Sequence, residues 1–315
     1  MSAGGADGAG PSRRKPSWLK VKQPAPRQYR ATEDVIDELV LHTVCREARC
    51  PNKGECYAAG TATFLILGDV CTRSCRFCSV EHGAGRQRPG GEATAAACVL
   101  DPDEPRRVAE AARRLRLDHV VITSVTRDDL SDGGAGHFAA AVAAVRAAVP
   151  ATTVEVLIPD LGGDEAALAG VLAARPDVLN HNLETVPRLY PHVRPQAVYE
   201  RSLEVLSRAA SWARHDERRA GSRRPLVKTG LMVGLGEDLA EVDGVLADSA
   251  AAGVDLVTVG QYLQPDASCL PVARYVTPPE FARLAEAGQA RGLQVRAAPL
   301  VRSSYRAGED IERLA

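Results

Sequence analysis

The sequence lacks a long uninterrupted apolar run, and it lacks an excess of charge of either sign. No stretch approaches the length that a membrane-spanning helix needs. The 315 residues carry a formal net charge of −1, whereas a general nucleic-acid-binding protein is clearly basic. The N-terminal stretch MSAGGADGAGPSRRKPSW has no apolar core of the kind found in signal peptides. We therefore expect neither a membrane nor a nucleic acid as a partner. We expect a cytoplasmic location, with import into an organelle as the less favoured alternative.

Cysteine, by contrast, is present eight times, and most of the cysteines are clustered. In a reducing compartment, clustered cysteines indicate metal binding or catalysis rather than disulfides. Cys98 and Cys269 lie outside the clusters and have no partner at ligand spacing. We interpret these two as free structural cysteines.

From residue 63 onward, short β-branched runs alternate with helical patterns. This alternation predicts parallel strands joined by right-handed crossovers, hence an α/β fold. We expect a partial (β/α)6-type TIM barrel, with a doubly wound open sheet as the rival. The expected strands are 63–68, 119–125, 152–159, 177–183, 226–234, 254–263 and 293–300; the expected helices are 104–115, 137–148, 165–174, 199–212, 239–252 and 279–291.

Four segments follow from this pattern. Residues 1–16 are expected to be a disordered leader, and residues 17–62 an N-terminal extension that carries three cysteines. Within it, apolar residues at helical spacing predict a helix over 32–44 with Thr32 as its N-cap. The barrel is expected to span residues 63–292, and a C-terminal extension residues 293–315.

The stretch GDVCTRSCRFCSV places Cys71, Cys75 and Cys78 just beyond the first expected strand. In a βα-barrel, the loops at that end of the strands carry the chemistry. A structural zinc site needs a fourth ligand, for which His82 is the nearest candidate. Three thiolates on a 4Fe–4S cluster instead leave one iron open to bind another molecule.

A purely structural interpretation of the same three cysteines is also possible. Their i, i+4, i+7 spacing would form a small apolar face on a helix. Arg73, Ser74 and Arg76 interrupt any continuation of such a face, so we favour metal ligation.

The spacing Cys-x3-Cys-x-aromatic-Cys, with Phe77 as the aromatic residue, resembles the signature of the radical S-adenosylmethionine (SAM) superfamily. The resemblance implies that SAM chelates the open iron and is cleaved to a 5′-deoxyadenosyl radical. Such a radical removes hydrogen from unreactive carbon, a step for which acidic and basic side chains are too weak.

A second set, Cys45-x4-Cys50-x5-Cys56, lies in HTVCREARCPNKGEC. A second cluster is the natural interpretation, and a zinc knuckle the alternative. The two sets together resemble the lipoyl synthase family, and the similarity extends from about Lys15 nearly to the C-terminus. It includes the stretches LDPDEPRRVAEA, SDGGAGHFA, VEVLIPDLGG, NHNLETVPRLYPHVRPQAVYERSLEVL, KTGLMVGLGE, VGQYLQP and PLVRSSYRAGE.

The resemblance implies an enzyme that inserts two sulfur atoms, at C6 and C8, into an octanoyl chain bound to a carrier lysine. Two SAM molecules are consumed, and an auxiliary 4Fe–4S cluster on the second cysteine set is the sulfur source. Its fourth ligand is a serine of the RSSY motif, which we assign to Ser304, with Ser303 as the alternative. A hydroxyl oxygen is a harder donor than a thiolate, so it can be released from iron more readily.

The resemblance also implies partners. These are octanoylated lipoyl carrier domains, namely the E2 subunits of 2-oxoacid dehydrogenases and the H protein of the glycine cleavage system. An electron donor such as ferredoxin or flavodoxin and an iron–sulfur carrier for cluster repair are expected as well.

Polar residues at the expected strand ends are candidates for SAM contacts. Satisfied hydrogen bonds in the core are the competing explanation for the residues of the NHN stretch, and a helix cap is the competing explanation for the aspartates. The principal candidates are Asp128, Asn180, Asn182 and Glu184; Asp129, Glu155 and Lys228 are weaker ones. Arg194 could meet a carboxylate or a phosphate, but an ordinary surface arginine is the default explanation.

Two other functions remain open at this point. A biotin synthase-like sulfur-inserting enzyme would share the first cysteine set but not the second set or RSSY. A non-catalytic iron–sulfur or zinc protein would need no SAM pocket.

Overall fold

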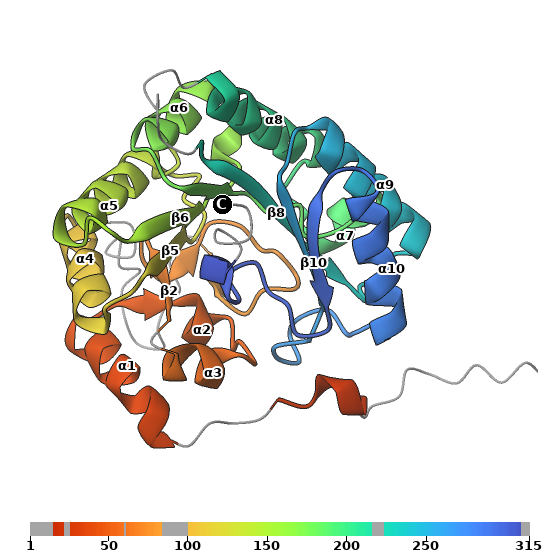
Figure 1. Cartoon of the computed structure of the whole chain (residues 1–315), viewed down its shortest axis with the longest axis horizontal. Helices are drawn as coiled ribbons and strands as arrows, with labels where there is room; N and C mark the ends of the chain where they lie inside the picture. Colours follow the sequence, from red (N-terminus) through yellow and green to blue (C-terminus); the bar gives the residue numbers. More distant parts are fainter. Residues whose placement is uncertain (1–14, 22–25, 60, 84–99, 216–223, 310–315) are drawn as a thin grey trace, which may run out of the picture.

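The structure is a computed structural model, and it describes residues 15–21, 26–59, 61–83, 100–215 and 224–309 (Figure 1). Most of the expected leader lies outside the described residues. Cys98 also lies outside them.

The main sheet has eight strands in the order β1-β2-β5-β6-β7-β8-β9-β10. Every neighbouring pair is parallel except β1–β2, which is antiparallel. The bounds are β1 (His42–Thr43), β2 (Thr63–Ile66), β5 (His119–Ser124), β6 (Thr153–Leu157), β7 (Val178–Asn180), β8 (Leu226–Val233), β9 (Leu256–Gln261) and β10 (Gln294–Ala298).

The strand order distinguishes between the two expected folds. Successive parallel strands are spatial neighbours from β2 to β10, whereas a doubly wound sheet reverses its strand order midway. Among the described strands, β1 and β10 stand at opposite ends of the order and do not pair. The α/β partial-barrel prediction is therefore confirmed, and the sheet is open.

Helices cover the outside of the curved sheet (Figure 1). Two of them begin with capping boxes, in which Asp238 pairs with Glu241 and Thr277 with Glu280. The covering helices are α4 (Glu104–Leu115), α5 (Ala135–Ala148), α6 (Glu165–Ala173), α8 (Tyr199–His215), α9 (Leu239–Ala251) and α10 (Pro278–Gln289); shorter ones are η3 (Leu161–Gly163), η4 (Pro187–Leu189) and α7 (Tyr190–Val193). None of the helices in the described ranges is long and apolar enough to span a bilayer.

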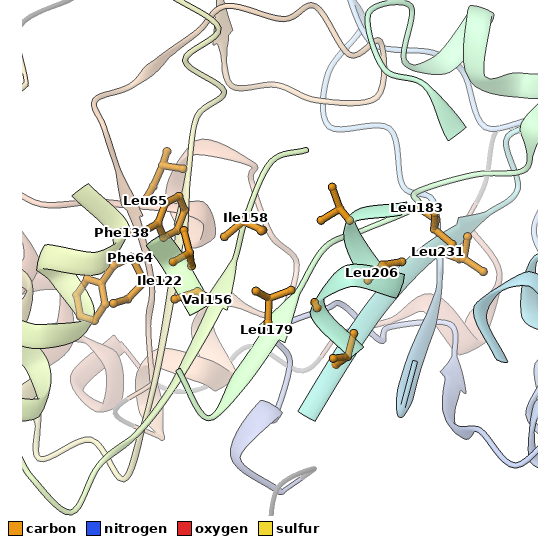
Figure 2. Close-up of a cluster of buried hydrophobic side chains, with 14 of the residues drawn as sticks. Phe64, Leu65, Ile122, Phe138, Val156, Ile158, Leu179, Leu183, Leu206 and Leu231 are labelled. Atoms are coloured by element: carbon orange, nitrogen blue, oxygen red, sulfur yellow. The ribbon is translucent and has the colours of Figure 1, made fainter. Parts of the chain in front are cut away.

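One row of side chains across four strands forms the layer between sheet and helices. Phe64, Ile122, Val156 and Leu179 are register partners in turn, and all are fully buried. Figure 2 shows this row beside Phe138 of α5. The neighbouring row, on the other face of the strands, is therefore left to line the barrel interior.

The N-terminal extension contains η1 (Ser17–Leu19), α1 (Pro26–Glu38), α2 (Val44–Glu47) and α3 (Lys53–Ala58). The predicted helix over 32–44 was wrong in its bounds, because α1 begins at Pro26 and ends at Glu38. Thr32 is not an N-cap: it lies within α1, and its buried hydroxyl donates to the Tyr57 carbonyl at 2.9 Å. Packing of α1 on α3 satisfies this hydroxyl, so a cap is not needed.

Candidate cluster-binding site

Cys71, Cys75 and Cys78 lie on a loop that starts at β3 (Val70–Cys71) and returns to β4 (Glu81–His82). The backbone N–H of Thr126 donates to Cys71 Sγ at 3.3 Å, which joins the loop to the end of β5. The three cysteines line one side of a cavity of about 170 Å³. We refer to this as the first cavity.

Arg73 anchors this loop from inside. Its Nε and Nη2 donate to the two carboxylate oxygens of Asp128 at 2.8 Å, and Nη2 also donates to Asp160 at 2.6 Å. Burial alone would raise the pKa of Asp160, but the hydrogen bond and charge of Arg73 lower it to about 2. The loop that carries the first cysteine set is thus fixed by a buried ion pair.

The first cavity is also lined by polar residues, one of which, Arg194, lies next to Cys75. Ser124 Oγ, His181 Nε2 and Arg194 Nε are buried there, and none has a hydrogen-bond partner among the described residues. Burial lowers the pKa of His181 to about 4, and its Nδ1 lies 2.8 Å from the Ile158 carbonyl. His181 is therefore neutral with its proton on Nδ1, which leaves Nε2 as an acceptor. Buried polar atoms of this kind need a polar ligand.

The second cysteine set and the RSSY motif meet at another cavity of about 430 Å³, here called the second cavity. Cys45, Cys50, Cys56, Ser303 and Ser304 all line it. The cysteines come from α2, α3 and the turn between them, and the serines come from the segment after β10. The motif and the three cysteines lie about 250 residues apart in the chain, yet the fold brings them together.

Direct contacts hold these two segments against each other. Tyr305 Oη donates to Glu55 at 2.8 Å, and Arg306 contacts the same carboxylate at 2.8 Å. The buried Asn52 donates from Nδ2 to the Leu300 carbonyl at 2.8 Å. The segments that carry the four expected ligands are therefore joined by hydrogen bonds on both sides of Ser304.

The two cavities adjoin. Phe77, Cys78, Asn182 and Glu184 are among the residues that line both of them, so the two cysteine sets face adjoining spaces. This arrangement allows a molecule in the second cavity to lie next to one in the first.

The thiols suit iron–sulfur clusters. Burial raises the pKa of Cys45 to about 11, and burial raises those of Cys56 and Cys78 to about 12. Thiolates in such places need a cation that replaces the proton, which cluster iron supplies. In the described ranges, no three His, Cys, Asp or Glu side chains converge on a point where one metal ion could bind. A single zinc ion requires this convergence. A 4Fe–4S cluster does not, because each of its thiolates binds a different iron.

The other expected SAM contacts have different surroundings. Asp128 is occupied by Arg73, and Asp129 accepts from Arg127 at 2.7 and 2.8 Å. Asn180 is fully buried and donates to Glu155 at 3.0 Å. These residues are absent from the walls of both cavities, unlike Asn182 and Glu184.

Two further candidates belong to the same interior network. Lys228 lies 3.2 Å from Glu155, and both side chains are buried. Neither lines a cavity, whereas Arg194 lines the first one and donates to the carbonyls of Asn182 and Leu183.

Several residues of the site were not predicted from the sequence. Ser124 and His181 carry unpartnered polar atoms in the first cavity, and Arg73 holds the loop. His181, the middle residue of the NHN stretch, could have been predicted, because a polar side chain on a buried strand usually has a hydrogen-bonding role. Cys269 is buried, and its Sγ donates to the Cys78 carbonyl at 3.5 Å, outside both cavity walls.

Comparison with known proteins first defines the class. The model of the radical SAM superfamily matches residues 65–248, which include the first cysteine set and the strands β5 to β8. Solved structures share the fold at low identity. The FeFe-hydrogenase maturase HydG of Carboxydothermus hydrogenoformans has a TM-score of 0.51 at 16% identity, over 79% of this chain and 64% of that one. Streptococcus suis SuiB bound to S-adenosylmethionine has a TM-score of 0.50 at 10% identity, over 75% and 49%.

More similar relatives then define the family. The model of the N-terminal domain of lipoyl synthase matches residues 7–50. Curated lipoyl synthases from Oleidesulfovibrio alaskensis and Nitratidesulfovibrio vulgaris are 54% and 53% identical, over 96% of this chain and 96% and 94% of theirs. The lipoyl synthase of Chlorobaculum parvum is 48% identical over 95% of both chains. The chain belongs to the lipoyl synthase family. It is a radical SAM sulfurtransferase, and its cofactors are SAM and 4Fe–4S clusters.

Proposed function

We propose that the chain inserts two sulfur atoms, at C6 and C8, into an octanoyl group on a lysine of a lipoyl carrier domain. In this proposal Cys71, Cys75 and Cys78 bind the SAM-dependent cluster. The auxiliary cluster is bound by the second cysteine set, Cys45, Cys50 and Cys56, together with Ser304. The observation that carries the proposal is the placement of the cysteines: the first set lines the first cavity, the second set lines the second cavity, and Cys78 lines both.

Ser304 is favoured over Ser303 as the oxygen ligand. The Ser303 hydroxyl donates to Asn182 Oδ1 at 2.9 Å, so this hydroxyl already has a partner. No hydrogen bond of the Ser304 hydroxyl is present in the described part of the chain, and this residue lines the second cavity. Its oxygen is therefore available to an iron atom.

Bound SAM and its cluster supply a carbon-centred radical that removes hydrogen from an alkyl chain. The side chains provide the surroundings for this chemistry. Leu65, Phe77, Leu157, Leu231 and Leu263 contribute apolar surface to the second cavity, which suits an octanoyl chain and excludes water. The first cavity is smaller. His181 Nε2 and Arg194 Nε, which belong to residues that line this cavity and not the second, can meet the polar amino acid and ribose parts of SAM.

Among the earlier candidates for SAM binding, Asn182 and Glu184 are supported by their places in the cavity walls. Asp128 is better assigned to holding Arg73, and Asn180 to the interior hydrogen bond with Glu155.

The partners of the reaction are proposed on chemical grounds. The substrate carriers are lipoyl domains of E2 subunits and the glycine cleavage H protein. Ferredoxin or flavodoxin supplies electrons, and an iron–sulfur carrier restores the auxiliary cluster. All of these are cytoplasmic, which is where we place the chain.

Mass spectrometry of an octanoyl-lysine peptide tests the proposal. Anaerobically reconstituted protein should hold about eight iron atoms, as two four-iron clusters. With SAM and a reductant it should add two sulfur atoms to the peptide and release two 5′-deoxyadenosines per product. The Cys45→Ala variant should still cleave SAM but add no sulfur. The control Cys269→Ser lies outside both cavities and keeps a donor toward the Cys78 carbonyl, so it should do both.

Two outcomes contradict the assignment. A single cluster in the wild-type protein would favour a biotin synthase-like or a non-catalytic iron–sulfur protein. Sulfur insertion by a chain that lacks Cys45, Cys50 and Cys56 would exclude the auxiliary cluster as the sulfur source.

A further inference from the structure

A chain of hydrogen bonds leads from the RSSY motif to the wall that the two cavities share. Ser303 Oγ donates to Asn182 Oδ1 at 2.9 Å, and Asn182 Nδ2 donates to Glu184 Oε1 at 3.0 Å. Asn182 and Glu184 line both cavities, while Ser303 lines only the second. The Asn182 side chain thus connects a residue next to Ser304 with a carboxylate in the first cavity.

The barrel strands leave space for this contact. A Cβ atom at Gly230 of β8 would lie 2.5 Å from Ser303 Oγ and 2.6 Å from Asn182 Oδ1. Both distances are shorter than those that real Cβ atoms adopt, so the Ser303–Asn182 hydrogen bond requires glycine at position 230. Gly260 of β9 is similar, since a Cβ atom there would overlap the Val301 carbonyl oxygen. The RSSY segment therefore packs directly on the backbone of two strands.

The backbone of Asn182 is fixed independently of Ser303. Arg194 Nη1 donates to the Asn182 carbonyl at 3.0 Å, and the Leu183 N–H lies 3.2 Å from Thr229 Oγ1. Only the side-chain amide is left to respond to Ser303. With Ser303 present as a donor, Asn182 Oδ1 faces the hydroxyl, and Nδ2 faces the Glu184 carboxylate.

We propose that Ser303 is a positioning residue that couples the auxiliary-cluster segment to the SAM site through Asn182 and Glu184. The inference rests on the proposed function, because it takes Ser304 as a ligand of the auxiliary cluster. Ser303 and Ser304 are neighbours in the chain, so a Ser304 that leaves its iron carries Ser303 away from Asn182. The arrangement of Asn182 and Glu184 at the SAM site would then differ between protein with an intact auxiliary cluster and protein in which that cluster has been dismantled. Coupling of this kind is reciprocal, so bound SAM also favours retention of Ser304 by its iron.

SAM affinity of the Ser303→Ala variant is the direct measurement. We expect equilibrium dialysis on the anaerobically reconstituted protein to show SAM binding weakened roughly two- to tenfold, the effect of one hydrogen bond. A chelator assay should show that SAM slows iron release from the wild-type auxiliary cluster but not from Ser303→Ala. Ser268→Ala is the matched control, because this exposed serine hydrogen-bonds within its own turn, to Asp266 and Cys269, and lines neither cavity. It should behave as the wild type does in both assays.

A second variant acts on the same contact from another strand. Gly230→Ala displaces Ser303 and Asn182 without removing either side chain, and it should weaken SAM binding as Ser303→Ala does. Gly170→Ala is its control, since a Cβ atom there meets nothing within 4 Å. If Ser303→Ala does not fold, the comparison of Gly230→Ala with Gly170→Ala tests whether the Ser303–Asn182 contact affects SAM binding.

Unchanged SAM affinity in both variants would overturn the inference. So would a Ser303→Ala protein that binds SAM normally but loses auxiliary iron, because Ser303 would then be the ligand. Failure of the proposed function is recognised separately: the wild-type protein would itself add no sulfur to the octanoyl peptide.

Discussion

Replacement of Arg73 by alanine tests how the first cysteine loop is held. The substitution leaves the Asp160 carboxylate, whose side chain is fully buried, without its principal partner. Removing one partner of a buried ion pair costs about 3–5 kcal/mol of unfolding free energy. Asp128 is 43% exposed and adds little, and Arg201 stays 3.5 Å from Asp160, so we expect about 3 kcal/mol.

This loss can be measured as a change in melting temperature. With about 2.1 cal/mol/K of unfolding entropy per residue, 315 residues give about 0.66 kcal/mol/K. A loss of about 3 kcal/mol then lowers the Tm by roughly 5 °C. Circular dichroism on the cluster-loaded protein records the Tm, and iron analysis should show a reduced content of the first cluster.

A control in the same loop separates this effect from a general one. Arg76 is exposed, and within the described structure the hydrogen bond of its side chain is to His192, at 2.9 Å; its backbone hydrogen bonds do not depend on the side chain. Arg76→Ala should change the unfolding free energy by less than about 0.5 kcal/mol. Adding Asp160→Asn to Arg73→Ala should recover part of the Tm, because the uncompensated charge is gone. Equal Tm values for the two arginine variants would refute the reasoning.

Three further predictions concern the C-terminal segment and pH. Gly260→Ala, whose Cβ atom overlaps the Val301 carbonyl, should displace the RSSY segment and reduce bound iron from about eight toward about four per chain, as measured by iron analysis. Glu55→Gln weakens the contact with Tyr305; the carboxylate is 43% exposed, so stability should fall by less than about 1 kcal/mol, but a chelator should remove auxiliary iron faster. The pKa of Asp160 is about 2, against an ordinary 3.8, so its ionised carboxylate stabilises the fold above about pH 4. This stabilisation disappears as the pH falls from about 4 to 2. The denaturant midpoint should fall over this pH range in the wild type, and this part of the fall should be absent from Asp160→Asn.

The barrel could be predicted from sequence because its signals are local. β-branched runs and helix caps lie within the elements that they define, so the helix over 104–115 was predicted with its observed bounds. The N-cap prediction for Thr32 was wrong because it used local sequence alone. The acceptor of the Thr32 hydroxyl is the Tyr57 carbonyl of α3, 25 residues away in the chain.

The candidate site was predictable only in its ligand types. Cysteine spacing indicates two ligand sets, but it does not show that their cavities share a wall. Asp128 resembled a ribose-binding residue because its partner Arg73 is 55 residues distant in sequence. Long-range ion pairs of this kind have no signature within a sequence window, and for that reason the roles of Asp128 and Asn180 became visible only in three dimensions.

The distance along the chain between Cys56 and Ser304 has a consequence for biosynthesis. At about 5–20 residues per second, a ribosome needs roughly 10–50 s to make the intervening segment of about 250 residues. Throughout that interval the nascent polypeptide displays three thiols without the serine that we propose as the fourth ligand. With that assignment, we expect delivery of the auxiliary cluster to follow near-complete translation, and metal captured earlier would be held by cysteines alone.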